Sequence, residues 1–197
     1  LITGNLISGI YGLGTGPHHA GQLFGRGILA SGSGDGLTIT DNVIGPDITG
    51  APLLGAVWGL DLGDPVTHPL NMTGISVTDN EIAGHILNGV TVGRNTAAVR
   101  LAGNSIHDHG WLGIDLIPSG YGYGVSPNDP LDLDTGGNGM QNFPELASVL
   151  RSGASLLVEG ALHSAPSASF TLEFFASPAC DDSGHGEGQL PLGTAQV

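Results

Sequence analysis

Four oxygen-bearing side chains lie close together in the stretch "NDPLDLDTGGNGMQNFPEL", which covers residues 128–146. They are Asp129, Asp132, Asp134 and Asn138, and the stretch contains no Lys or Arg. Carboxylate and amide oxygens are the ligands that Ca²⁺ prefers, and a glycine-rich turn can add backbone carbonyls. Closely spaced carboxylates also repel one another unless a cation lies between them. These four residues are therefore the predicted ligands of a structural Ca²⁺ ion, and a solvated acidic linker is the alternative interpretation.

A second group of residues could support catalysis on a polysaccharide. Asp61 and Asp115 occupy matching positions in "WGLDL" and "LGIDL", and His107 and His109 lie in "HDHG". Two carboxylates about 5–10 Å apart can serve as general acid and general base in glycoside hydrolysis. The two imidazoles, with His85, could instead hold a transition metal. Polar residues on the outward face of amphipathic strands and turns are the plainer interpretation of both groups.

An internal repeat predicts the elements that position these residues. Its template is an Asn with a branched apolar residue three positions before it and another two after it, and it is centred on Asn5, Asn42, Asn80 and Asn104. Asn80 and Asn104 are 24 residues apart, and so are the glycines at 89 and 113 that open a second template of alternating apolar and polar residues. The repeat therefore has a fixed period in its last part.

Short alternating strands that recur at a fixed interval cannot bury an apolar face alone, whereas stacked neighbours can. The sequence therefore predicts an all-β fold that begins with a right-handed parallel β-helix over residues 1–118, with successive coils about 4.8 Å apart. The template asparagines are expected at turns, with left-handed dihedrals and amide hydrogen bonds from coil to coil.

Stacking in register makes further predictions about single residues. Asp61 and Asp115 fall two coils apart, at roughly 9.6 Å, with Thr91 between them. His109 falls directly over His85 by the same alignment. The apolar ladder that starts at Leu60 and ends at Ile114 is expected to point into the core.

The first two coils are longer than the others, because 37 residues separate Asn5 from Asn42 and 38 separate Asn42 from Asn80. The extra residues are rich in turn formers and predict loops that leave the solenoid. Loops on a rigid scaffold commonly carry function. His18, His19 and His68, which lie in these insertions, are therefore noted as possible functional side chains.

The 24-residue rhythm is not resumed after Leu116. An Asp- and Gly-rich junction is expected over residues 119–146, followed by a partial antiparallel β-sandwich over residues 147–197. Its predicted strands are "SLLVEGAL" and "SFTLEFFAS", joined by "HSAPSA", and then "LGTAQV". Three strands make an incomplete sandwich, so its open edge, like the exposed coil ends, is a predicted site of self-association.

Composition limits the classes of partner. The 197-residue chain has no Lys, four Arg and a formal net charge of −14, which disfavours binding to nucleic acid and anionic lipid. A divalent cation or a neutral polymer such as a glycan is the more natural partner. No stretch approaches the ~20 apolar residues of a transmembrane helix. Since the sequence starts within a repeat and without Met, we expect it to be a piece of a longer protein.

Three stretches resemble one class of protein: "NSIHDHGWLGIDL", "NDPLDLDTGGNGMQNFPEL" and "LEFFASPACDDSGHGEGQLPLG". They are similar to the C-terminal part of large bacterial cell-surface and secreted proteins, in which right-handed parallel β-helix repeats precede an Asp-rich segment and a β-sandwich module. The resemblance implies an exported, extracellular or cell-surface protein with a structural or adhesive role. It implies no catalytic residues.

The segment Asp132–Gly136, with the pattern Asp-x-Asp-x-Gly, also resembles the calcium-binding loops of thrombospondin type 3 repeats. This resemblance implies Ca²⁺ ligation by Asp132 and Asp134, with Asp129 and Asn138 as additions. The sequence as a whole favours a non-catalytic β-helix module that acts as a spacer or adhesin and assembles into fibres. A lyase, epimerase or hydrolase on the same scaffold is the alternative.

Overall fold

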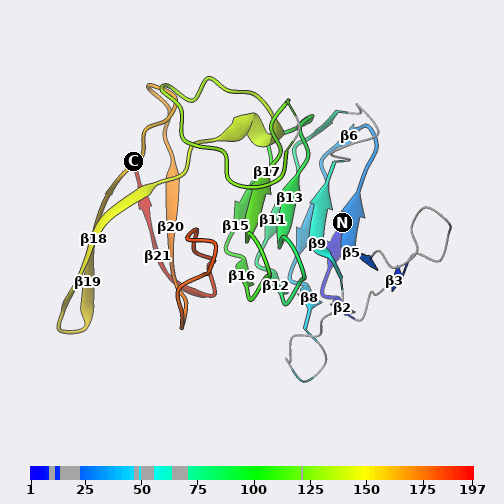
Figure 1. Cartoon of the computed structure of the whole chain (residues 1–197), viewed down its shortest axis with the longest axis horizontal. Helices are drawn as coiled ribbons and strands as arrows, with labels where there is room; N and C mark the ends of the chain where they lie inside the picture. The colour runs from blue at the N-terminus through cyan, green and yellow to red at the C-terminus, as the bar shows by residue number, and fades with distance from the viewer. Residues whose placement is uncertain (9–11, 14–22, 47–48, 50–55, 64–70, 121) are drawn as a thin grey trace.

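The computed structural model describes residues 1–8, 12–13, 23–46, 49, 56–63, 71–120 and 122–197 (Figure 1). His18, His19 and His68 lie outside these residues. The described part consists of β-strands and one short 3₁₀ turn, η1 (Gly137–Met140). It contains no helix with the length and apolar character needed to cross a membrane.

Four parallel sheets form the walls of a β-helix, as the sequence predicted. Sheet 1 contains β1 (Ile2–Thr3), β7 (Thr38–Thr40), β11 (Ser76–Thr78) and β15 (Arg100–Ala102). Sheet 2 contains β2 (Leu6–Ser8), β8 (Val43–Gly45), β12 (Glu81–Ala83) and β16 (Ser105–His107). Sheet 3 contains β5 (Arg26–Ala30), β9 (Trp58–Leu62), β13 (Val90–Val92) and β17 (Ile114–Leu116). Sheet 4 contains β6 (Gly34–Asp35), β10 (Met72–Thr73) and β14 (Thr96–Ala97).

The register of these sheets is the one that the repeat predicted. Asp61 pairs with Thr91, and Thr91 pairs with Asp115. One long insertion of the first coil carries a small antiparallel pair, β3 (Gly12–Leu13) with β4 (Leu23–Phe24). The coils therefore stack in phase despite their different lengths.

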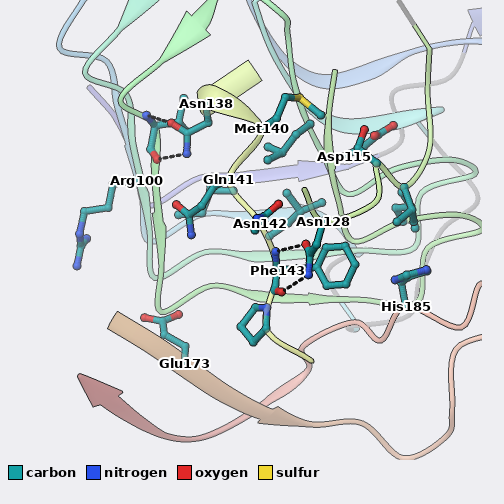
Figure 2. Close-up of a pocket in the computed structure, with 18 of the residues that line it drawn as sticks. Arg100, Asp115, Asn128, Asn138, Met140, Gln141, Asn142, Phe143, Glu173 and His185 are labelled. Carbon is teal, nitrogen blue, oxygen red and sulfur yellow. Dashed lines mark hydrogen bonds between the residues drawn. The ribbon is translucent and has the colours of Figure 1, made fainter. Parts of the chain in front are cut away.

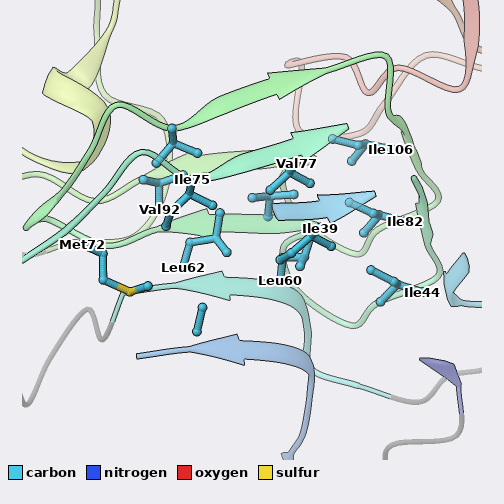
Figure 3. Close-up of a cluster of buried hydrophobic side chains, with 13 residues drawn as sticks. Ile39, Ile44, Leu60, Leu62, Met72, Ile75, Val77, Ile82, Val92 and Ile106 are labelled. Carbon is cyan, nitrogen blue, oxygen red and sulfur yellow. The ribbon is translucent and has the colours of Figure 1, made fainter. Parts of the chain in front are cut away.

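The core consists of branched side chains stacked along the helix axis (Figure 3). Ile39 and Val77 from sheet 1 belong to this cluster together with Leu60 and Val90 from sheet 3, and all four are fully buried. Burying one such side chain contributes about 1.5–3 kcal/mol. The alternation of the template therefore supplies most of the apolar burial.

The template asparagines form a continuous ladder between sheets 1 and 2. The backbone N–H of Asn42 and its Nδ2 both donate to Oδ1 of Asn80, at 3.0 and 2.9 Å, and Asn80 donates to Asn104 in the same way. The predicted left-handed dihedral falls one residue earlier, at Asp41 (φ 55°) and Asp79 (φ 57°). The preceding residue therefore makes the turn, which leaves the asparagine side chain free to point inward.

The last coil differs from the prediction because no further coil covers it. Ile114, expected in the core, is 45% exposed, whereas Leu60 and Val90 below it are buried. A segment of the junction, residues 136–140, closes part of this end instead. The N–H of Gly137 donates to the carbonyl of Ile117 at 2.9 Å, and Met140 is buried against the coil. We call this segment the first cap.

The first cap depends on close backbone contact. A Cβ atom on Gly137 would lie 2.2 Å from the carbonyl oxygen of Val92. We expect Gly137→Ala to lower the free energy of unfolding by about 1–3 kcal/mol, because the segment must shift away from the coil. Urea denaturation measures this, with Gly120→Ala as the control, since no atom lies within 4 Å of a Cβ there. Equal stabilities of the two variants would contradict the packing.

A second segment, residues 187–189, covers the free edge of sheet 2, and we call it the second cap. Ile106 and Gly188 exchange two backbone hydrogen bonds of 2.9 Å in an antiparallel bridge. The hydroxyl of Ser105 donates to the carbonyl of Gln189 at 2.7 Å. Pairing of this kind removes unsatisfied backbone groups from an exposed edge.

Beyond the junction the predicted antiparallel strands are confirmed as two separate hairpins. β18 (Glu145–Ser152) pairs with β19 (Ser155–Ala161), and β20 (Thr171–Ala176) pairs with β21 (Leu190–Gln196). The strands on either side of "HSAPSA" thus each pair with another partner, and the sequence pattern missed β18, which starts inside the predicted junction. Leu150 and Leu157 on the first hairpin are exposed.

Candidate functional site

The three aspartates of the junction lie in one group. A carboxylate oxygen from each of Asp129, Asp132 and Asp134 lies within 4.8 Å of the others, and all three side chains are partly buried. Leu131 and Asp132 take left-handed φ angles of 66° and 60°, which fold the loop back on itself. This turn in the backbone thus brings the three carboxylates together, although their like charges repel one another.

Hydrogen bonds attach this loop to two other parts of the chain. Oδ1 of Asp132 accepts the backbone N–H of Asn142 at 3.0 Å, and its Oδ2 accepts the hydroxyl of Ser164. The Nδ2 of Asn142 donates to the carbonyls of Asp129 and His163, at 2.8 and 2.7 Å. The aspartate group therefore joins the segment after the first cap to the link between β19 and β20.

Asp134 is the least satisfied member of the group. Its Oδ1 is buried and has no hydrogen-bond donor. Burial raises the pKa of Asp134, and the neighbouring charges of Asp129 and Asp132 raise it further. A cation among the three carboxylates would remove this repulsion, so the residues fit a divalent metal with oxygen ligands.

Asn138, the fourth predicted ligand, is engaged with the last coil. Its Oδ1 accepts the backbone N–H of Val99 at 2.8 Å, and its Nδ2 donates to the carbonyl of Val99 at 3.2 Å (Figure 2). The side chain thus imitates the backbone of a further strand and helps to hold the first cap. The sequence did not indicate this role, nor the part that Asn142 and Ser164 play in the aspartate loop.

Asp61 and Asp115 lie in the predicted ladder, but each is only 2% exposed, contrary to the interpretation of outward-facing residues. Arg26 forms an ion pair with Asp61. Asp115 accepts a 2.8 Å hydrogen bond from Nδ2 of Asn88 and another from the N–H of Gly124. The loop that contains Gly124 folds over the strand, and burial raises the pKa of Asp115 to about 6.

His109 lies over His85 as predicted, with the ring centroids 5.1 Å apart. Nδ1 of His109 accepts the backbone N–H of His85, and its Nε2 lies 3.1 Å from the carbonyl of Ile82. A carbonyl can only accept, so Nε2 carries the proton and the ring is neutral. Both nitrogens of His109 are occupied within the protein, which removes it from a metal site or a general-base role.

His107 lies on β16 and is paired with its neighbour, since Nδ1 lies 2.7 Å from Oδ2 of Asp108. Beside it, the carboxylate of Glu187 in the second cap accepts the N–H of His109. Burial raises the pKa of Glu187 to about 7, and the charges of Asp181 and Asp108 also raise it.

The four residues of the catalytic alternative thus belong to different surroundings. Asp61 lies in the ion pair with Arg26, Asp115 under the loop of Gly124, and the two histidines at the turn beside the second cap. Within the described residues, the grouping of possible metal ligands is the aspartate triad alone. The structure therefore brings together the predicted calcium ligands Asp129, Asp132 and Asp134, while Asn138 is engaged at Val99. Asp61 and Asp115 lie two coils apart in one ladder, as the sequence predicted.

No protein-family model, curated protein or solved structure matches this chain.

Proposed function

We propose that this chain is a non-catalytic, exported β-helix module, in which Ca²⁺ fixes the solenoid to the hairpins that follow it. The observation that carries the proposal is the aspartate group, which is bonded to Asn142 on one side and to Ser164 on the other. A cation there would stiffen the connection between the segment after the first cap and the link between β19 and β20. The role is that of a spacer at the cell surface or outside the cell.

The residues that would hold the ion are Asp129, Asp132 and Asp134, with backbone carbonyls and water completing the six to eight oxygen ligands of Ca²⁺. Bound Ca²⁺ would supply positive charge where the chain has none. The calcium assignment accounts for the buried, donor-free Oδ1 of Asp134, whereas a solvated linker does not.

Removing calcium is expected to destabilise the protein. We expect chelation to lower the melting temperature, because binding to the folded state alone adds about 2.7 kcal/mol at a ligand concentration 100 times the Kd. Differential scanning calorimetry with Ca²⁺ and with a chelator measures this difference. The double variant Asp132→Ala with Asp134→Ala should abolish it, while Asp35→Ala, which alters an aspartate on β6, should retain it. An unchanged melting temperature on chelation would leave the loop as an acidic linker.

The adhesin and fibre roles are further parts of the proposal. The first cap covers part of the end of the solenoid after β17 and the second cap pairs with the edge of sheet 2, so self-association is better supported at the hairpins, where Val149, Leu150 and Leu156 are exposed. Light scattering across protein concentrations tests the association, and a constant monomeric mass would remove it.

The alternative function, a polysaccharide-active enzyme, has one favourable observation: the pKa of Asp115 is raised to about 6, as a general acid requires. Its engagement by Asn88 and Gly124 gives a sufficient structural reason for that burial. Turnover of a polysaccharide that is lost in Asp115→Asn, with the fold retained, would favour the enzyme over the spacer.

A further inference from the structure

The chain contains two Asn–Gly pairs, Asn88–Gly89 and Asn138–Gly139. In such a pair the backbone nitrogen of the glycine can attack Cγ of the asparagine, because glycine has no side chain to block the approach. The first pair lies inside the coils, and the second lies in the first cap, within η1. The two pairs therefore differ in how readily this reaction can occur.

Packing protects Asn88–Gly89. Asn88 is 2% exposed; its Nδ2 donates to Oδ2 of Asp115 at 2.8 Å, and its Oδ1 accepts the N–H of Leu112. The N–H of Gly89 donates to the carbonyl of Leu112 at 2.9 Å, and a Cβ atom on Gly89 would lie 2.5 Å from Nε2 of His109. Neither the amide nor the glycine nitrogen can move toward the other without disrupting the coil.

Asn138–Gly139 lies on the open side of the first cap. Gly139 is exposed, and no atom lies within 4 Å of the position of its Cβ. Its N–H donates to the carbonyl of Gly136 over a long distance of 3.2 Å. Asn138 takes a left-handed φ of 49°, which costs free energy, and the two bonds between its amide and Val99 hold it there (Figure 2).

The closed cap keeps these groups from reacting. The Asn138 amide is bonded to Val99, and the Gly139 N–H is bonded to Gly136. Short segments outside the strands open locally at a lower free energy than the whole fold, so the cap can open while the coils stay folded. The pair at 138 therefore reacts from the open cap, whereas Asn88 reacts only when the coils unfold.

We propose that Asn138 is a deamidation site whose conversion opens the first cap permanently. In the open cap the Gly139 nitrogen forms a bond to Cγ of Asn138 and the Cγ–Nδ2 bond breaks, so that Nδ2 leaves as ammonia with the proton of the Gly139 N–H. Water then opens the cyclic imide at one of its two carbonyls, which gives aspartate or isoaspartate without oxidation or reduction. The proposal goes beyond the spacer function and does not depend on calcium.

The products cannot restore the closed cap. In an aspartate, one carboxylate oxygen can still accept the N–H of Val99, but the other would face the carbonyl oxygen of Val99, where Nδ2 of Asn138 now donates at 3.2 Å. An isoaspartate also lengthens the backbone by one carbon, next to Gly137, which has no room for an added atom beside Val92. Both products therefore favour the open cap, which uncovers the last coil.

Incubation of the whole protein in mildly alkaline buffer, followed by peptide mapping with mass spectrometry, tests the site. We expect Asn138 to convert at least about tenfold faster than Asn88, since local opening is more frequent than unfolding of the coils. Gly137→Ala, which loosens the cap, should speed the conversion of Asn138 about fivefold or more. Gly120→Ala, the matched control, should leave the rate unchanged.

Hydrogen exchange tests the consequence for the cap. Ion-exchange chromatography separates the converted protein by its added negative charge. In this fraction the N–H of Gly137, which is bonded to Ile117, should exchange at least about fivefold faster than in the unconverted protein. The N–H of Val90, which is bonded to Gly113 within the coils, should exchange at the same rate in both.

Three results would overturn the proposal. They are equal rates of conversion at Asn138 and Asn88, an unchanged rate at Asn138 in Gly137→Ala, and unchanged exchange of the Gly137 N–H in the converted fraction. The first and third of these need no variant, so they decide the matter even if Gly137→Ala does not fold. The proposal is supported if Asn138 converts first and the cap amide then loses its protection.

Discussion

Asn80→Ala is expected to lower the free energy of unfolding by about 3–5 kcal/mol, since it removes the centre of the asparagine ladder. Oδ1 of Asn80 accepts two hydrogen bonds from Asn42, and its Nδ2 donates to Asn104 and to the carbonyls of Thr78 and Ile39. Alanine would leave these buried groups of three coils without partners. Equilibrium denaturation with urea measures the loss.

Asn5→Ala is the matched control for this experiment. Asn5 occupies the same template position, but it is exposed, and among the described residues it donates to Asn42 and to the carbonyl of Thr3. The variant should lose under about 1 kcal/mol, because water can replace the missing bonds. Similar losses in both variants would mean that the ladder does not act through burial.

Acid is expected to destabilise the protein through the stacked histidine pair. Burial lowers the pKa of His85 from 6.5 to about 4; it also lowers the pKa of His109 to about 3, with the charges of His85 and His107 adding to the effect. Below pH 6.5 the unfolded chain therefore binds more protons than the folded one, so stability falls as pH falls. For His85, which is 2% exposed, the loss is on the order of 3 kcal/mol by pH 4.

The carboxyl groups of Asp115, Glu187 and Asp134, whose pKa values are raised, act in the opposite direction. The raised pKa values of Asp115 and Glu187, about 6 and about 7, mean that the folded state holds more protons as pH falls from neutral, which stabilises it. The pH dependence of the wild-type stability is therefore the sum of two opposed effects, one from the histidines and one from the carboxyl groups. His85→Gln isolates one of them: the stability of the variant relative to the wild type should rise steadily from pH 7 to pH 4.5. A constant gap across this range, measured by urea unfolding, would contradict the buried neutral imidazole.

The coils were predictable because their signal repeats. Each template carries the same apolar positions around its asparagine, so an alignment of the sequence with itself gave the register, the asparagine ladder and the pairing of His85 with His109. In this part of the chain, residues that are distant in sequence contact each other when they occupy equivalent positions in successive copies of the repeat. The positions of the stacked residues therefore follow from the spacing of the repeat alone.

The caps and the burial of Asp115 were not predictable in this way. Asn138 contacts Val99 across 39 residues, and the cap segment that contains Asn138 belongs to no repeat that could reveal the pairing. Ile114 has the same sequence environment as Leu60, yet it is exposed because it lies in the last coil. For the candidate site, charge density indicated the three aspartates, whereas the partners Asn142 and Ser164 depend on how the chain returns after β19.

The second cap also governs when the solenoid can be completed during synthesis. Ser105 and Gln189 are 84 residues apart, so the edge of sheet 2 stays open until the final hairpin has left the ribosome. At about 5–20 residues per second, that interval is roughly 4–17 seconds. An unpaired strand edge is a template for aggregation throughout this time. Yield during expression should therefore depend on the elongation rate and on chaperones that protect this edge.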